Sequence, residues 1–266
     1  NTQIVYISTK QRNMNQFPKN IFLPTFNSPP VHQKIIVEDP VTKEGVVDEQ
    51  KLEKIVNPLF TNPTLKRKEK EEDGTTYYIE GSIVVKYFPF GVIEYTNQST
   101  SEINRQMSFI EAYQIAKGFL DKHQTVLDKD HILDNPLYLS GQRKTNAGWE
   151  FYFDFRLQDI PYVFSREIRE KVNMSHAVKM IVEDKKVKLY RRLTWEGQLS
   201  DEEREVNISY PQALGEVISS LHAQGVEQVQ IDDMYWAYYQ KELNVAPEVY
   251  WMVSIGDQLY PIRASQ

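Results

Sequence analysis

The chain contains no cysteine, which excludes disulfide bonds, thiolate chemistry and cysteine-based zinc sites together. It also lacks an uninterrupted run of about 18 apolar residues, so no part of the printed sequence is predicted to cross a bilayer as a helix. Basic residues are the minority: 31 Lys and Arg stand against 37 Asp and Glu, for a formal net charge of −6. Because phosphate binding needs a basic face, nucleic acid is a poor candidate for a partner.

The sequence motifs of common catalytic sites are missing as well. No phosphate-binding loop, dinucleotide fingerprint, H-E-x-x-H zinc motif or G-x-S-x-G nucleophile motif occurs. The five histidines are scattered without metal-ligand spacing. The segment "DKDHILD" fails as a calcium loop, because Ile132 and Leu133 stand where an oxygen ligand and a Gly are required. We therefore expect a protein that is not an enzyme and holds no cofactor or metal; a hydrolase that uses scattered carboxylates stays open as an alternative.

What the chain does have is enough apolar and aromatic side chains for a packed core, since 41% of its 266 residues are hydrophobic and 12% are aromatic. This length fits one large domain or two of ordinary size. The first 74 residues are the least regular part, and the prolines from Pro18 to Pro30 interrupt any helix or strand there. We expect an irregular N-terminal segment over 1–74 that contains a strand.

From Thr75 onward, the same order of elements occurs twice. Each half shows strands rich in Tyr, Val and Ile, then a helix that begins with a capping box, then further strands. Ser108 with Glu111 begins the first helix, Ser209 with Gln212 begins the second, and the two serines are 101 residues apart. An order this specific predicts a tandem duplication.

The duplication defines the fold class that we expect. One helix for every four or so strands indicates an antiparallel sheet that is covered on one face. The sequence therefore predicts an α+β protein made of two tandem antiparallel-sheet-plus-helix repeats, preceded by the irregular N-terminal segment. The repeats are expected over 75–167 and 173–266, and they should superpose as two copies of one unit.

A group of aromatic residues indicates a binding surface. Two neighbouring predicted strands near the C-terminus carry aromatic side chains on both of their faces, although a sheet with a helix on one side needs apolar residues on one face only. The second face either packs on the rest of the protein or forms an exposed patch that docks a protein partner, and the sequence does not show which face that is. The candidate interaction residues are Tyr235, Trp236, Tyr238, Tyr239, Tyr250 and Trp251.

The C-terminal stretch "APEVYWMVSIGDQLYPIRAS", together with the serine-capped helices, resembles the YycH/YycI family of Firmicute bacteria. The residues that match the family's final strands are Pro247, Trp251, Val253, Tyr260, Ile262 and Ala264. The resemblance covers about 75–266, and nothing is recognised over 1–74. The unit of helix and hairpin is also similar to the PepSY-type domains of protease propeptides and spore germination proteins.

The resemblance to YycH/YycI implies a regulator and supplies no catalytic residues. Members of that family lie outside the cell and are anchored by one N-terminal transmembrane helix in the membrane of Gram-positive bacteria. They modulate the sensor histidine kinase WalK, also called YycG, of a cell-wall two-component system, so the implied partners are this kinase and a sibling regulator. Because the chain begins at Asn, we expect that a membrane anchor precedes it. The similarity to PepSY keeps a second hypothesis open, an inhibitor of a peptidase or a propeptide-type module.

Overall fold

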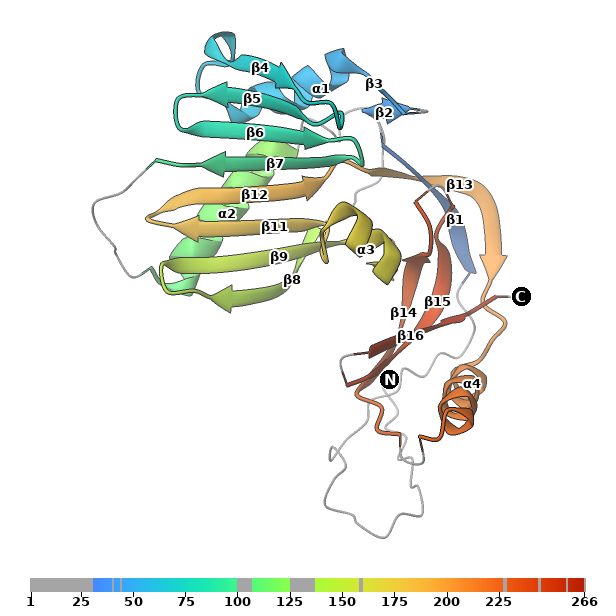
Figure 1. Cartoon of the computed structure of the whole chain (residues 1–266). Helices are drawn as coiled ribbons and strands as arrows, with labels where there is room; N and C mark the ends of the chain where they lie inside the picture. The colour runs from blue at the N-terminus through green and yellow to red at the C-terminus, as the bar shows by residue number, and fades with distance from the viewer. Residues whose placement is uncertain are drawn as a thin grey trace.

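Alternating apolar and polar residues build most of the strands, and these strands form one long sheet whose last three strands turn away from the rest (Figure 1). The computed structural model describes residues 31–39, 41–43, 45–99, 107–124, 137–157, 160–226, 229–243, 245–256 and 258–265. The proline-rich start at 1–30 and the segment "DKDHILD" lie outside the described residues. The fold is mixed α+β with sheet-plus-helix units, as the sequence predicts.

The described residues contain four α-helices, which are α1 (Glu49–Val56), α2 (Phe109–Gln124), α3 (Arg166–Val172) and α4 (Tyr210–Ala223), and two short 3-10 helices at Asn57–Leu59 and Pro63–Leu65. The first eight strands are β1 (Val31–Glu38), β2 (Thr42–Lys43), β3 (Val46–Val47), β4 (Arg67–Lys70), β5 (Thr76–Glu80), β6 (Ile83–Phe88), β7 (Val92–Asn97) and β8 (Leu137–Lys144). The others are β9 (Gly148–Leu157), β10 (Ile160–Phe164), β11 (Val178–Glu183), β12 (Lys186–Leu193), β13 (Glu196–Glu205), β14 (Asp233–Gln240), β15 (Glu248–Ile255) and β16 (Gln258–Arg263).

The main sheet has 12 strands in the order β16-β15-β14-β10-β9-β11-β12-β7-β6-β5-β4, and β8 also pairs with β9. Its neighbouring strands are antiparallel except for β10 and β14, which run parallel over three residue pairs. Strands β1 and β13 form a separate two-stranded ribbon. The parallel pair is therefore the seam where the sheet of the second half joins the sheet of the first.

The β11–β12 hairpin has a place that the sequence does not predict. Sequence order assigns it to the start of the second repeat, at 173–266, but in space it is inserted between β7 and β9. There it completes the sheet on which α2 packs. Apolar alternation identifies a strand but not its neighbours, because pairing is decided by contacts between segments far apart in the chain. The repeat boundaries themselves stay a prediction.

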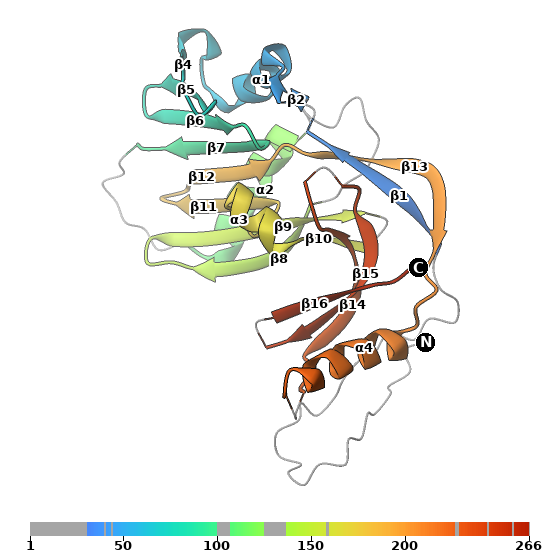
Figure 2. The same cartoon turned by 45° about the vertical axis from the view of Figure 1, so that its right-hand side comes forward.

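Three helices lie on one face of the main sheet, which we call the covered face. Helix α2 packs against β9, β11 and β12, and α4 packs against β15 and β16 (Figures 1 and 2). Helix α1 shares a core with α2, since Leu52 and Val56 are buried in the same apolar cluster as Ala112 and Ala116. The opposite face, which we call the open face, carries the short helix α3 near one end (Figure 1). Two apolar cores result, one centred on α2 and one on α4.

The two large helices are held at their starts by the same kind of tryptophan hydrogen bond. The indole Nε1 of Trp149 donates to the carbonyl oxygen of Met107 (3.0 Å), one residue before the N-cap of α2. The indole Nε1 of Trp251 donates to the carbonyl oxygen of Ile208 (2.7 Å), one residue before the N-cap of α4. In each unit a tryptophan on a central strand thus fixes the chain at the start of the helix. This repetition of a detailed contact supports the predicted duplication.

Both predicted capping boxes are present. The backbone N–H of Ser108 donates to Glu111 Oε2 (3.2 Å), and the N–H of Glu111 donates to Ser108 Oγ (3.2 Å). The N–H of Ser209 donates to Gln212 Oε1 (2.8 Å). These bonds satisfy N–H groups at the helix start that would otherwise have no partner in the helix.

We expect Ser108→Ala and Ser209→Ala each to lower the free energy of unfolding by about 1 kcal/mol, because each removes a cap. Urea unfolding followed by circular dichroism measures the change. Ser219→Ala, at an exposed position inside α4, is the matched control and should leave stability unchanged or slightly higher, since Ala is the better helix former. Cap variants that behave like this control would show that the boxes contribute nothing.

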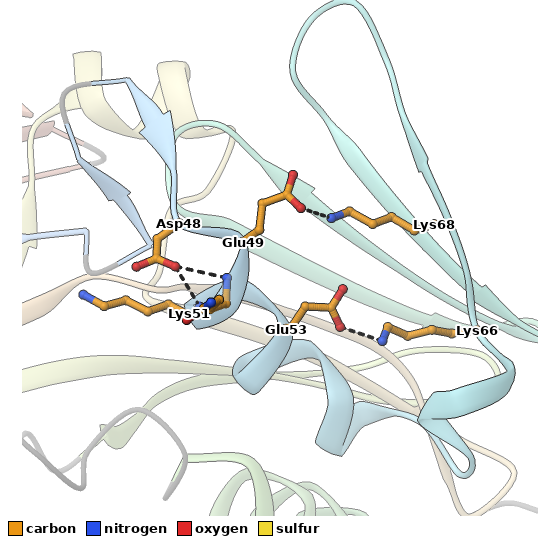
Figure 3. Close-up of polar contacts among 7 residues, drawn as sticks. Asp48, Glu49, Lys51, Glu53, Lys66 and Lys68 are labelled. Atoms are coloured by element: carbon orange, nitrogen blue, oxygen red, sulfur yellow. Dashed lines mark hydrogen bonds and ion pairs between the residues drawn. The ribbon is translucent and has the colours of Figure 1, made fainter.

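Helix α1 is fastened to β4 by two ion pairs (Figure 3). Asp48 caps the helix by accepting from two backbone N–H groups of the first turn (3.0 and 3.1 Å). Glu49 and Glu53, one turn apart, reach Lys68 and Lys66 on or next to β4, each at 2.6 Å. Every residue of β4 is exposed and charged. Such an edge strand resists pairing with other chains, because pairing would bring its charges together.

Helix α3 connects the two halves on the open face. At its start, the N–H of Ser165 donates to the carbonyl oxygen of Gln240 (3.0 Å), and Ser165 Oγ donates to the carbonyl oxygen of Lys241 (2.8 Å), both at the end of β14. At its end, Arg191 Nη2 on β12 donates to the carbonyl oxygen of Val172 (3.2 Å). The helix is therefore bonded to the second half at one end and to the first half at the other.

Candidate protein-interaction face

The six candidate aromatic residues divide between the two faces of the β14–β15 pair. Trp236, Tyr238 and Trp251 lie on the covered face, in or against the core under α4. Tyr238 is fully buried and Trp251 is 2% exposed. The indole rings of Trp236 and Trp251 lie 4.7 Å apart between centroids. Tyr238 and Trp251 therefore fill the core and are not free to contact a partner, whereas Trp236 packs against this core and stays partly exposed.

Tyr235, Tyr239 and Tyr250 lie on the open face. Each is half-buried, and none belongs to either apolar core. The rings of Tyr239 and Tyr250 meet edge to face, with centroids 5.1 Å apart. Burial is the largest of the effects that raise the pKa of these three hydroxyls, so the hydroxyls are neutral at physiological pH. We call these three residues the tyrosine patch.

Arginines border the tyrosine patch. The guanidinium of Arg156 on β9 lies 4.4 Å from the ring centre of Tyr138 on β8. Burial is the largest cause that raises the pKa of Tyr235. Tyr138 on β8 and Asp154 on β9 raise this pKa further, and Arg169 on α3 lowers it, so all three elements lie near the tyrosine. Tyr and Arg are enriched at protein–protein interfaces. The patch therefore has the composition of an interface and lies where the two halves meet.

Next to the patch, the open face carries a row of charged side chains. Strand register pairs Tyr152 with Lys179, Lys179 with Arg191, Arg191 with Glu94, and Glu94 with Lys86. Residues at paired positions of antiparallel strands share a face of the sheet. The row thus crosses β9, β11, β12, β7 and β6 on the face without large helices.

Two carboxylates in this region, Glu150 and Glu94, are each shared by two cations. Glu150, only 1% exposed, lies 2.6 Å from Lys179 Nζ and accepts from Arg143 Nε at 2.7 Å. Burial alone would raise the pKa of Glu150, but hydrogen bonds from Lys179, Tyr152 and Arg143 outweigh it and hold the pKa below its ordinary value.

Glu94 is shared in the same way. It lies 3.2 Å from Arg191 Nη1 and 3.8 Å from Lys86 Nζ. Its side chain and that of Arg191 are mostly buried, with 15% and 17% exposed. The pairs fix the charged row in one geometry.

A cavity of about 380 Å³ opens on this face between the charged row and the chain that leaves α3. Its walls combine the sheet residues Glu94, Tyr152, Lys179 and Arg191 with the segment from Asn173 to His176, and Leu189 completes them. Asn173 adopts the left-handed conformation (φ 50°) that turns the chain back after α3.

A serine, a histidine and an aspartate meet beside the cavity, but not as a catalytic triad. His176 Nδ1 lies 2.8 Å from Asp154 Oδ2 and 3.4 Å from Ser140 Oγ. A triad needs the serine at Nε2 and the carboxylate at Nδ1, so that one ring nitrogen takes the serine's proton while the other is held. Here both partners share Nδ1. The His176 ring also lies 4.6 Å from the ring of Tyr152, which together with Asp154 positions it in the wall of the cavity.

Within the part of the chain that the structure describes, no group of three or more His, Asp and Glu side chains is arranged to hold a metal ion. The same described segments contain no helix that is both long and apolar enough to cross a membrane.

Comparison with known proteins gives one likeness at the level of the fold. Neither a protein-family model nor a curated protein matches the chain. A solved structure does match. It is the crystal structure of an uncharacterized protein from Eubacterium rectale, which is 12% identical, with a TM-score of 0.51 over 89% of this chain and 82% of that one. At this identity the likeness shows that the fold is shared, and nothing about function.

The sequence predicted Tyr235, Tyr239 and Tyr250 among six candidates on two faces, without choosing a face, and it did not predict the charged part of this face. In "GWEFYFDFRL", the alternation of apolar and polar residues puts Glu150, Tyr152, Asp154 and Arg156 on one face of β9. It gave no sign that Lys179 and Arg191 lie beside them, because register between strands far apart in the chain leaves no local pattern.

Proposed function

We propose that this protein is a non-enzymatic regulator that acts outside the cell, anchored to the membrane of a Gram-positive bacterium, and that it binds a membrane sensor histidine kinase of a cell-wall two-component system. The resemblance to YycH/YycI suggests the partner. The observation that carries a binding role is the tyrosine patch: three half-buried tyrosines on the open face that contribute to neither apolar core.

The residues that carry the resemblance are mainly structural. Trp251 and Val253 are buried in the core under α4, and Ala264 is fully buried as well. They support a shared scaffold, and the tyrosine patch supplies the surface. Tyrosine suits this role because it buries a large area while losing few rotamers, and because interface hot spots favour Tyr and Arg.

Membrane anchoring would strengthen a modest interface. Two anchored proteins move in the same plane, so their effective concentration is high and weak contacts suffice. The tyrosine patch is small compared with a standard protein interface, which fits an interaction of this kind.

We expect the double variant Tyr239→Ala/Tyr250→Ala to bind the extracytoplasmic part of the kinase about ten-fold more weakly or worse, with little change in melting temperature. Surface plasmon resonance with the immobilised kinase domain measures the affinity. The control is Ile110→Ala, which truncates a side chain that is 65% exposed on α2, on the covered side. It should leave binding unchanged.

Two outcomes would oppose the proposal. Unchanged kinase binding by a folded double variant would remove the patch from the interface. Absence of kinase binding by the unaltered protein, with capture of a peptidase instead, would favour the PepSY-like inhibitor.

A further inference from the structure

We propose that the cavity beside α3 binds a small ligand that carries an oxyanion group, a carboxylate or a phosphate. This site is separate from the tyrosine patch, and the inference does not depend on the partner proposed above. It rests on the balance of charge around the cavity, on the hydrogen-bond donors in its wall and on its size.

The charge around the cavity is positive although the protein as a whole is negative. Lys179, Arg191 and Glu94 line the cavity, and Lys86, Arg143 and Glu150 belong to the same ion pairs without lining it. His176 and Asp154 form a further pair. With Asp154 counted, four cations stand against three carboxylates, so the region holds one cation more than carboxylates in a chain whose formal net charge is −6. A surplus of charge in a partly enclosed site attracts ions of opposite sign and raises their local concentration.

The cavity wall offers more donors than acceptors. Lys179 has three N–H groups, and Glu150 takes one of them. His176 uses Nδ1 for Asp154, which leaves Nε2 as its second hydrogen-bonding atom. Ser175 and Asn173 are both exposed at the cavity and add a hydroxyl and an amide. Glu94 and Glu150 are already shared by cations, so a ligand rich in acceptor oxygens matches this wall best.

The dimensions limit the ligand. A volume of about 380 Å³ is near the lower end of the range for small-molecule sites, roughly 300–1,000 Å³. It fits a metabolite-sized anion or one or two acidic side chains of a peptide. Both sources present the same chemistry, and they can be separated by experiment.

The test uses the whole chain and three probes: citrate, inorganic phosphate and an acetylated tetraglutamate peptide, each titrated calorimetrically at low ionic strength. We expect saturable binding of at least one probe, weakening as salt is added. Binding of citrate or phosphate identifies a free anion as the ligand, whereas binding of the peptide alone identifies acidic side chains. No saturable binding of any probe would overturn the proposal.

Two variants locate the site. Ser175→Asp adds a negative charge at the cavity without touching an ion pair, and Lys179→Gln removes a cation but keeps a donor for Glu150. We expect each to weaken binding by about three- to ten-fold, the effect of one charge at a distance of several ångströms. Gln50→Glu, the same change of charge at an exposed position of α1 on the covered side, is the control and should bind like the unaltered protein. Equal affinities in all four proteins would place the anion elsewhere and overturn the assignment.

Discussion

Trp251→Ala is expected to lower the free energy of unfolding by about 3–5 kcal/mol. The side chain is 2% exposed, packs against Trp236 at 4.7 Å and donates from Nε1 to the carbonyl oxygen of Ile208. Truncation leaves a cavity beneath α4 and a carbonyl without its partner at the start of that helix, and the two costs add. Urea unfolding, followed by tyrosine and tryptophan fluorescence and by circular dichroism, gives the change.

Two further variants separate packing from hydrogen bonding. Trp251→Phe keeps an aromatic ring and loses the indole N–H, so it should cost about 1–2 kcal/mol. Trp149→Phe removes the equivalent bond in the first unit and should cost about the same, because the indole of Trp149 makes the same contact before α2. If Trp149→Phe were neutral and Trp251→Phe costly, the two contacts would not be equivalent and the case for duplication would weaken.

The second large effect is a loss of stability in mild acid that depends on His123. Its side chain is 9% exposed and lies against Phe119 at 4.3 Å, and its Nδ1 is buried without a hydrogen bond among the described residues. Burial first, and then the charge of Lys122, lowers the pKa of His123 from 6.5 to about 4. The folded protein thus binds this proton less readily than the unfolded chain does.

The sign of the effect follows from that difference. Above pH 6.5 the imidazole is neutral in both states and the full stability is present. As the pH falls toward 4, the unfolded chain gains the proton and the folded protein does not, so the free energy of unfolding drops by about 3 kcal/mol in total. Urea unfolding at several pH values between 7 and about 4 measures the slope.

His123→Leu is the control for this effect. It keeps an apolar side chain against Phe119 and cannot titrate, so most of the pH dependence above pH 4.5 should disappear. Glu150 and Glu111, whose pKa values are lowered by hydrogen bonds, act only at more acidic pH and should still destabilise the variant there. A variant with the same slope as the unaltered protein would assign the effect to other groups.

Local patterns predicted the elements that depend on local chemistry. The capping boxes gave the starts of α2 and α4 to within a residue. The class of fold follows from these elements. The position of the β11–β12 hairpin between β7 and β9 does not, because its residues would suit a strand in either half. Register and neighbours arise from contacts between distant segments, which a single sequence records only weakly.

In the candidate site, too, the sequence predicted some features and not others. Sequence placed aromatic side chains on both faces of β14 and β15 but left the exposed face undecided. The structure decides it, because α4 covers Tyr238 and Trp251 and leaves Tyr235, Tyr239 and Tyr250 outside the cores. The cavity had no counterpart in the sequence analysis, since five separate elements bring its residues together.

The attachment of α3 has a mechanical consequence. The helix is a short rigid rod, about two turns long, that is pinned to the end of β14 through Ser165 and to β12 through Arg191. Arg191 also lines the cavity, so the cavity adjoins one end of the rod. Beyond the other end lies the seam of β10 and β14, which is only three residue pairs long. The rod therefore bridges the two halves beside this short seam, and its hydrogen bonds at both ends limit how far the two sheets can turn relative to each other.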